Sequence, residues 1–94
     1  MTHVGGELPT EVRPYKRTPT FTEATVPAGL TREHSTKAGV WGLLTVLTGE
    51  LLYVVPGENL EQLLDPAHQA VIKPEQVHYV RPVGHVEFFI EFCR

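Results

Sequence analysis

Two stretches decide how this chain folds: Ala28-Gly-Leu-Thr-Arg-Glu-His34-Ser-Thr-Lys-Ala-Gly-Val-Trp41-Gly42 and Val71-Ile-Lys-Pro-Glu-Gln-Val-His78-Tyr-Val-Arg-Pro82. Each is short, extended in character and interrupted by glycine or proline, the strongest local breakers of regular structure. In an extended segment alternate side chains share a face, so His34 and Thr36 point the same way. The pattern predicts two strand-like segments, each of which carries one histidine.

The rest of the chain follows the same pattern. Eight glycines and eight prolines divide it into short runs rich in Val, Thr, Phe, Tyr and Leu, which favours an all-β sandwich or barrel. The clearest hairpin is expected around Thr48-Gly49, and residues 60–64 allow either one helical turn or a short strand. The expected strands are residues 20–26, 30–36, 41–47, 50–55, 69–73, 77–81 and 85–93.

The last expected strand, residues 85–93, has the clearest alternation and follows a turn at Pro82-Val83-Gly84. One face carries Val86, Phe88, Ile90 and Phe92, and the other carries Glu87, Phe89, Glu91 and Cys93.

Composition limits the classes of function. The 94 residues make one domain, and a net charge of −3 gives no electrostatic reason to bind nucleic acid or an anionic membrane. The basic group Arg13, Lys16 and Arg17 has acidic neighbours in sequence, which is typical of a solvated surface. A single cysteine excludes an internal disulfide. No apolar stretch is long enough to span a membrane. We therefore expect a cytoplasmic protein.

Several phrases resemble a known family. They are Tyr15-Lys16-x-x-Pro19-x-Phe21, Pro27-Ala28-Gly29, His34-x-Thr36-Lys37-x-Gly39-x-Trp41-Gly42, Pro74-x-x-x-His78 and Phe89-Ile90-Glu91-Phe92. Together they are similar to the TehB/YeaR-like domain family, which includes the amino-terminal domain of the tellurite-resistance protein TehB. The match covers residues 14–94.

The resemblance implies a cupin-like double-stranded β-helix, a jelly-roll barrel, in a single domain at residues 14–94 after a flexible lead-in at residues 1–13. In this family the domain stands alone or precedes a methyltransferase domain. The resemblance also implies a link to tellurite or to oxidative and nitrosative stress.

A cupin barrel gathers imidazoles from separate strands around one metal ion, which makes His34 and His78 the expected metal ligands. Thr36 and Trp41-Gly42 stand where typical cupins have a second histidine and a glutamate, so a third ligand has to come from elsewhere. Glu91 is our choice and Glu87 the alternative. Two histidines and a carboxylate suit a divalent metal such as zinc, iron, manganese or nickel.

Three further residues are candidates for the ligand pocket. Thr36 is expected to form hydrogen bonds inside it, and Lys37 to stand at its rim, where it attracts an anion or pairs with a carboxylate. Trp41 is either a pocket wall or an aromatic of the core or of an interface.

The leading hypothesis is a metal-binding domain that also takes a small polar or anionic ligand, with a role in resistance to oxyanions or in stress response. One alternative is a metal-dependent cupin enzyme of the oxygenase or isomerase type. The other is a metal-free structural or interaction module. Strands that are apolar on both faces, within residues 41–55, also favour a homodimer.

Overall fold

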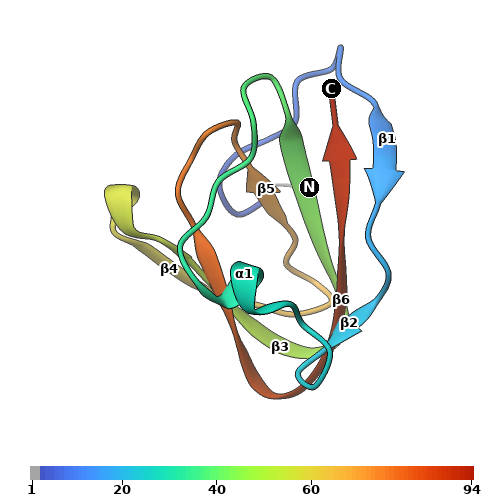
Figure 1. Ribbon diagram of the computed structural model, residues 1–94, viewed down its shortest axis with the longest axis vertical. Helices are drawn as coiled ribbons and strands as arrows, with labels where there is room; N and C mark the ends of the chain where they lie inside the picture. The colour runs from blue at the N-terminus through green and yellow to red at the C-terminus, as the bar shows by residue number, and fades with distance from the viewer. Residues whose placement is uncertain (1–2) are drawn as a thin grey trace.

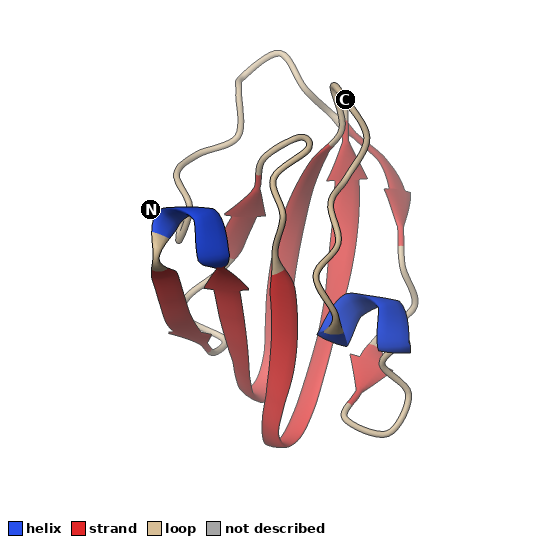
Figure 2. Ribbon diagram, turned by 60° about the vertical axis from the view of Figure 1, so that its left-hand side comes forward, coloured by secondary structure: helices blue, strands red, loops and turns tan. Residues whose placement is uncertain are grey.

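Two long strands form the centre of the structure, β3 (Trp41–Val55) and β6 (Tyr79–Cys93) (Figure 1). They pair antiparallel along their whole length, from Trp41 opposite Cys93 to Val54 opposite Tyr79. The computed structural model describes residues 3–94 of the chain. Both long strands curve at the same end of the molecule, so the sheet bends back over its own inner face (Figures 1 and 2).

Shorter strands extend this central pair on both sides. β1 (Pro14–Arg17) and β2 (Phe21–Thr22) pair with β6, whereas β4 (Leu60–Leu64) and β5 (Ala70–Ile72) pair with β3. The helical elements are a four-residue α1 (Ala28–Thr31) and a 3-10 turn η1 (Pro56–Glu58). The expectation of a mainly β domain is confirmed. Within residues 3–94, no helix is long and apolar enough to cross a membrane.

The hairpin expected around Thr48-Gly49 is wrong, because residues 41–55 form one continuous strand. Gly49 lies instead at a bulge in the pairing with β6, in a left-handed conformation with φ of 83°. A Cβ atom at Gly49 would lie 2.1 Å from the carbonyl oxygen of His85. The tight turn expected at Pro82-Val83-Gly84 is likewise part of the continuous β6, with Pro82 opposite Leu51.

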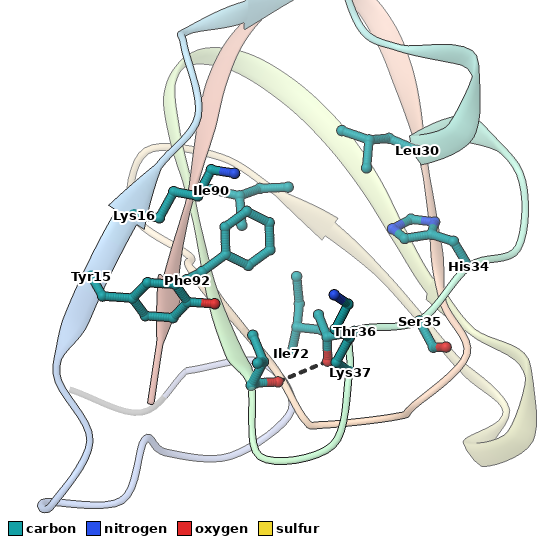
Figure 3. A pocket seen from close by; sticks show the side chains of 11 residues that line it. Tyr15, Lys16, Leu30, His34, Ser35, Thr36, Lys37, Ile72, Ile90 and Phe92 are labelled. Carbon is teal, nitrogen blue, oxygen red and sulfur yellow. Dashed lines mark hydrogen bonds between the residues drawn. The ribbon is translucent and has the colours of Figure 1, made fainter.

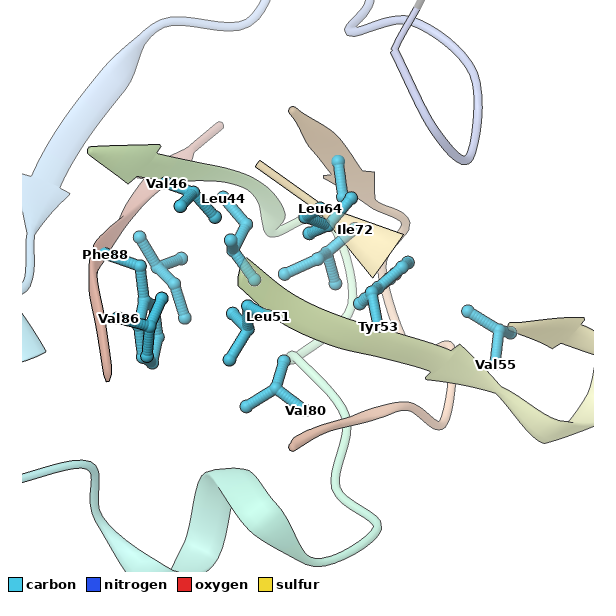
Figure 4. Close-up of a cluster of buried hydrophobic side chains, with 12 residues drawn as sticks. Leu44, Val46, Leu51, Tyr53, Val55, Leu64, Ile72, Val80, Val86 and Phe88 are labelled. Carbon is cyan, nitrogen blue, oxygen red and sulfur yellow. The ribbon is translucent and has the colours of Figure 1, made fainter. Parts of the chain in front are cut away.

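The register shifts between β3 and β6 reverse which side chains of β3 face inward, because the first of them, between Val46 and Thr48, places one extra residue, Leu47, in β3. Before them the even-numbered Leu44 and Val46 are buried on the inner face, and after them the odd-numbered Leu51 and Tyr53 are. One extra residue in a strand exchanges its two faces, so both halves of β3 can turn apolar side chains toward the same core. The core cluster comprises Leu44, Val46, Leu51, Tyr53, Val55, Leu64, Ala70, Ile72, Val80, Val86, Phe88 and Ile90 (Figure 4).

Other expected elements are shorter than predicted. Only Phe21–Thr22 of the 20–26 run is strand, and the segment expected to be extended from residue 30 begins within α1. The 60–64 segment is the strand β4 rather than a helical turn. Residues 3–13 precede β1, and Val4 in this lead-in bonds to the backbone of Gln69 and Val71.

Candidate functional site

Two backbone hydrogen bonds join the histidine segments. His34 N–H donates to His78 O at 3.0 Å, and His78 N–H donates to His34 O at 2.9 Å. The centroids of the two imidazole rings lie 4.1 Å apart, with their planes inclined by 59°. The fold therefore brings together the two imidazoles that the sequence pattern singled out.

Each ring of this pair is oriented by a local backbone carbonyl. Nδ1 of His34 bonds to Arg32 O at 2.8 Å, and Nδ1 of His78 bonds to Gln76 O at 2.8 Å. A carbonyl can only accept, so Nδ1 carries the proton and Nε2 holds the lone pair when the ring is neutral. Metal-binding histidines commonly have the same outer hydrogen bond.

His78 lies deeper than His34 and next to a buried tyrosine. His78 is only 2% exposed. Burial lowers the pKa of its imidazole, and the nearby His34 lowers this pKa by a smaller amount. The Tyr53 ring lies 5.9 Å away, and its buried hydroxyl has no hydrogen-bond partner in residues 3–94. Burial raises the pKa of Tyr53 well above its ordinary value. Both groups are therefore uncharged at neutral pH.

The structure does not bring Glu91 to the histidine pair. Glu91 pairs with Leu43 on one side and Arg17 on the other, and it lies on the face of β6 opposite to that of Ile90 and Phe92. Burial is the main cause of the raised pKa of the Cys93 thiol. The charge of Glu91, which shares this outer face with Cys93, raises it further.

The alternative ligand, Glu87, lies on the same outer face of β6 because strand residues alternate. In the part of the chain that the structure describes, no group of three His, Cys, Asp or Glu side chains could hold a metal ion. The facial set of two histidines and a carboxylate is thus not formed.

A pocket of about 320 Å³ opens beside His34 (Figure 3). One wall comes from β1 and the other from the segment between α1 and β3, with β5 and β6 forming the floor. His34 lines the pocket, whereas His78 does not. The lining residues are Tyr15, Lys16, Leu30, His34, Ser35, Thr36, Lys37, Val40, Ile72, Ile90 and Phe92.

Polarity is graded from the rim of this pocket to its floor. Lys16 and Lys37 are exposed at the rim, on opposite walls, whereas Ile72 and Ile90 at the floor are 1% and 3% exposed. No aspartate or glutamate belongs to the lining. Neither lysine forms an ion pair among the described residues. Such a pocket favours an anionic group over a cationic one.

Two of the predicted pocket residues have other roles. The Thr36 hydroxyl lines the pocket but donates to Val40 O at 2.8 Å, so it closes the turn that leads into β3 (Figure 3). Trp41 lies opposite Cys93, on the outer face of the sheet, and does not line the pocket. Its predicted role as a pocket wall is not seen, and the alternative of a packing aromatic fits its half-buried position.

The structure adds residues that the sequence did not single out. Tyr15 and Lys16 reach the pocket because β1 pairs with the end of β6, and the Arg94 guanidinium lies over the Tyr15 ring at 3.9 Å. The basic character of residues 13–17 indicated only a solvated surface. The recurring Tyr15-Lys16 phrase of the family resemblance was the one signal that could have pointed to them.

Comparison with known proteins decides the family. The model of the TehB-like domain family matches residues 16–90. The chain belongs to the TehB-like domain family. The TehB-like resemblance in the sequence is thereby confirmed.

The relatives of this TehB-like domain include much longer proteins. It is 33% identical over 75 residues to a Haemophilus influenzae (strain Rd) protein described as a probable S-adenosyl-L-methionine-dependent methyltransferase TehB, covering 74% of this chain and 26% of the relative. The H. influenzae TehB crystal structure matches with a TM-score of 0.82 and 29% identity over 89% of this chain and 32% of that one. The chain thus spans about a quarter to a third of TehB.

A second solved structure is of similar size to this domain. The crystal structure of an Escherichia coli (strain K12) protein matches with a TM-score of 0.84 and 26% identity, covering 94% of this chain and 95% of that chain. The same β architecture therefore occurs both as part of TehB and as nearly all of another solved chain.

Proposed function

We propose that this TehB-like domain binds a small anion in the pocket beside His34. The observation that carries the proposal is the lining itself, in which Lys16 and Lys37 stand on different walls of the pocket and no carboxylate is present. The Tyr15 hydroxyl, which points toward the same space in Figure 3, adds a hydrogen-bond donor for an anion. Tellurite is one member of this chemical class, and oxyanion resistance or stress response is the role that the family resemblance suggests.

Binding measurements on lysine variants test this proposal. We expect acetate and tellurite, titrated into ¹⁵N-labelled protein, to shift amide signals around the pocket, with weaker binding as salt is added because exposed charges are screened. Lys16→Gln and Lys37→Gln should each weaken anion binding about twofold to fivefold, the effect of one exposed charge. Lys73→Gln is the matched control, since Lys73 pairs with Glu58 at 3.7 Å and does not line the pocket.

The same titration can reject the proposal. If none of acetate, tellurite and hexanoate shifts pocket signals, or if Lys73→Gln weakens binding as much as Lys37→Gln, the pocket is not an anion site.

A divalent metal at the histidine pair is a second candidate, within the cupin-like jelly roll that the resemblance suggests. The paired orientation of His34 and His78, each with Nδ1 bonded to a carbonyl, favours it. The two residues would supply two nitrogen ligands, and solvent or a bound anion the remaining positions. Zinc, iron, manganese or nickel in purified protein, lost in both His34→Ala and His78→Ala, would support this candidate. Metal-free protein with unchanged anion binding would reject it.

Two further predictions accompany this function. An oxygenase or isomerase activity needs a third ligand, and the described residues provide no group of three; turnover is thus the weaker alternative to binding. The homodimer stays a prediction, and sedimentation as a monomer at working concentration would reject it.

A further inference from the structure

The pocket is built in two layers. The exposed rim carries the polar groups of Tyr15, Lys16 and Lys37, and the deeper part is apolar. His34 is half-buried, between the two layers. The apolar part consists of Leu30, Val40, Ile72, Ile90 and Phe92.

An inorganic oxyanion fits only the first layer. An oxyanion held at the rim by two solvated lysines gains little binding free energy, since exposed charge pairs contribute about 0–1 kcal/mol each. Moved down to Ile72 and Ile90 it would lose its water without gaining donors there. Burying a charge without compensating partners is strongly unfavourable.

The volume of the pocket leads to the same conclusion. A cavity of about 320 Å³ is at the lower end of the range for small-molecule sites, and a water molecule takes up only about 30 Å³ of liquid. A rim-bound oxyanion would leave the space above Ile72, Ile90 and Phe92 to water. An apolar group placed there would remove both its own surface and the floor from water, at about 0.8 kcal/mol per methylene.

From this layering, and resting on the proposed anion site, we infer that the ligand is an amphipathic organic acid: a carboxylate or similar monoanion with a compact apolar body. The anionic group lies between Lys16 and Lys37, and the apolar body lies on the floor formed by Ile72, Ile90 and Phe92. In Figure 3, Tyr15, Lys16, Phe92 and Lys37 surround a common space.

A chain-length series tests the inference. Acetate, butanoate and hexanoate carry the same charge at neutral pH, so only the apolar part changes. We expect the dissociation constant to fall about threefold to fourfold per added methylene until the floor is covered. Tellurite and phosphate should bind no more tightly than acetate. Benzoate, which is compact and flat, should bind at least as tightly as butanoate.

Two variants separate the layers. Lys37→Gln should weaken the binding of acetate and of hexanoate by the same factor, because it changes only the rim. Phe92→Leu should leave acetate unchanged and reduce the gain per methylene, because it changes only the floor. Thermal unfolding of both variants identifies any loss that comes from misfolding, and Ile90→Val serves as a milder floor variant if Phe92→Leu proves unstable.

The outcomes distinguish this inference from the proposal it rests on. Equal affinity across the carboxylates, or tighter binding of tellurite than of hexanoate, would overturn the organic acid while the anion site stands. No binding by any of these anions would overturn both.

Discussion

The two faces of β6 differ in what they contribute to the site. The inner face carries Val86, Phe88, Ile90 and Phe92, which form the core and the pocket floor. The outer face carries Glu87 and Glu91, the two carboxylates considered as metal ligands, beside Phe89 and Cys93. Consecutive residues of this strand therefore have side chains in different environments.

This comparison teaches that strand parity, rather than nearness in sequence, decides which residues reach the site. Glu91 lies between two pocket residues in sequence, yet its side chain points to the other face. The outer face is not fully exposed to solvent. Phe89 on this face is 8% exposed, and the Arg17 guanidinium carbon lies 3.6 Å from the centroid of its ring. Each face thus has its own packing, and substitutions can test them separately.

The largest contrast is expected at neighbouring positions Phe88 and Glu87. Phe88 is fully buried on the inner face, so Phe88→Ala should lower the free energy of unfolding by about 3–5 kcal/mol. Glu87→Ala on the outer face should change it by less than about 0.5 kcal/mol. Urea unfolding of both variants measures the difference. Similar losses for the two would mean that the faces are not distinct.

A second test concerns the bulged pairing of β3 with β6 at Gly49. Gly49→Ala introduces a Cβ that overlaps the His85 carbonyl, at a φ of 83° that other residues rarely adopt. We expect a loss of at least about 2 kcal/mol. Gly57→Ala is the control, because Gly57 has open space around it. If Gly49→Ala unfolds at the same denaturant concentration as Gly57→Ala, the bulge geometry is wrong.

A smaller effect should appear in the pH dependence of stability. Burial lowers the pKa of His78 in the folded state below its ordinary 6.5, so below that pH the unfolded chain binds more protons. The contribution of the neutral His78 to stability is then fully present above pH 6.5 and is lost as the pH drops toward the folded-state pKa. His78→Asn should flatten this part of the thermal-unfolding profile. The lowered pKa values of Glu23 and Asp65 affect only more acidic conditions, below 4.5 and 3.8.

If thermal stability depends on pH in His78→Asn as it does in the unsubstituted protein, the account of His78 as a buried, neutral histidine is contradicted. His68→Asn is a suitable control, because His68 is exposed and does not line the pocket.

Sequence alone predicted the features that depend on local alternation and on family motifs. The apolar face of residues 86–92 and the TehB-like family are of this kind, and so is the meeting of His34 with His78. Thr48-Gly49 was misread because a hairpin and a bulge require the same backbone freedom from glycine. Only the distant pairing partner decides between them, and here that partner is β6.

The candidate site was predicted in part for the same reason. Lys37 is expected at the rim from its motif and lines the pocket of the structure, whereas Lys16 reaches the pocket only through the pairing of β1 with β6. Glu91 was chosen for its chemistry although its own alternation places it with Cys93, away from Phe92. Strand parity, and not ligand type, therefore decides where the Glu91 side chain lies.

Methyl and indole signals test the central claim most directly. The chain has two isoleucines, Ile72 and Ile90, both in the pocket floor, and one tryptophan, Trp41, on the outer face. Titration of hexanoate into protein with labelled isoleucine δ1 methyls should shift both methyl signals with one dissociation constant and leave the Trp41 indole N–H in place. Hexanoate that shifts the Trp41 signal and neither isoleucine would contradict an inner-face ligand site.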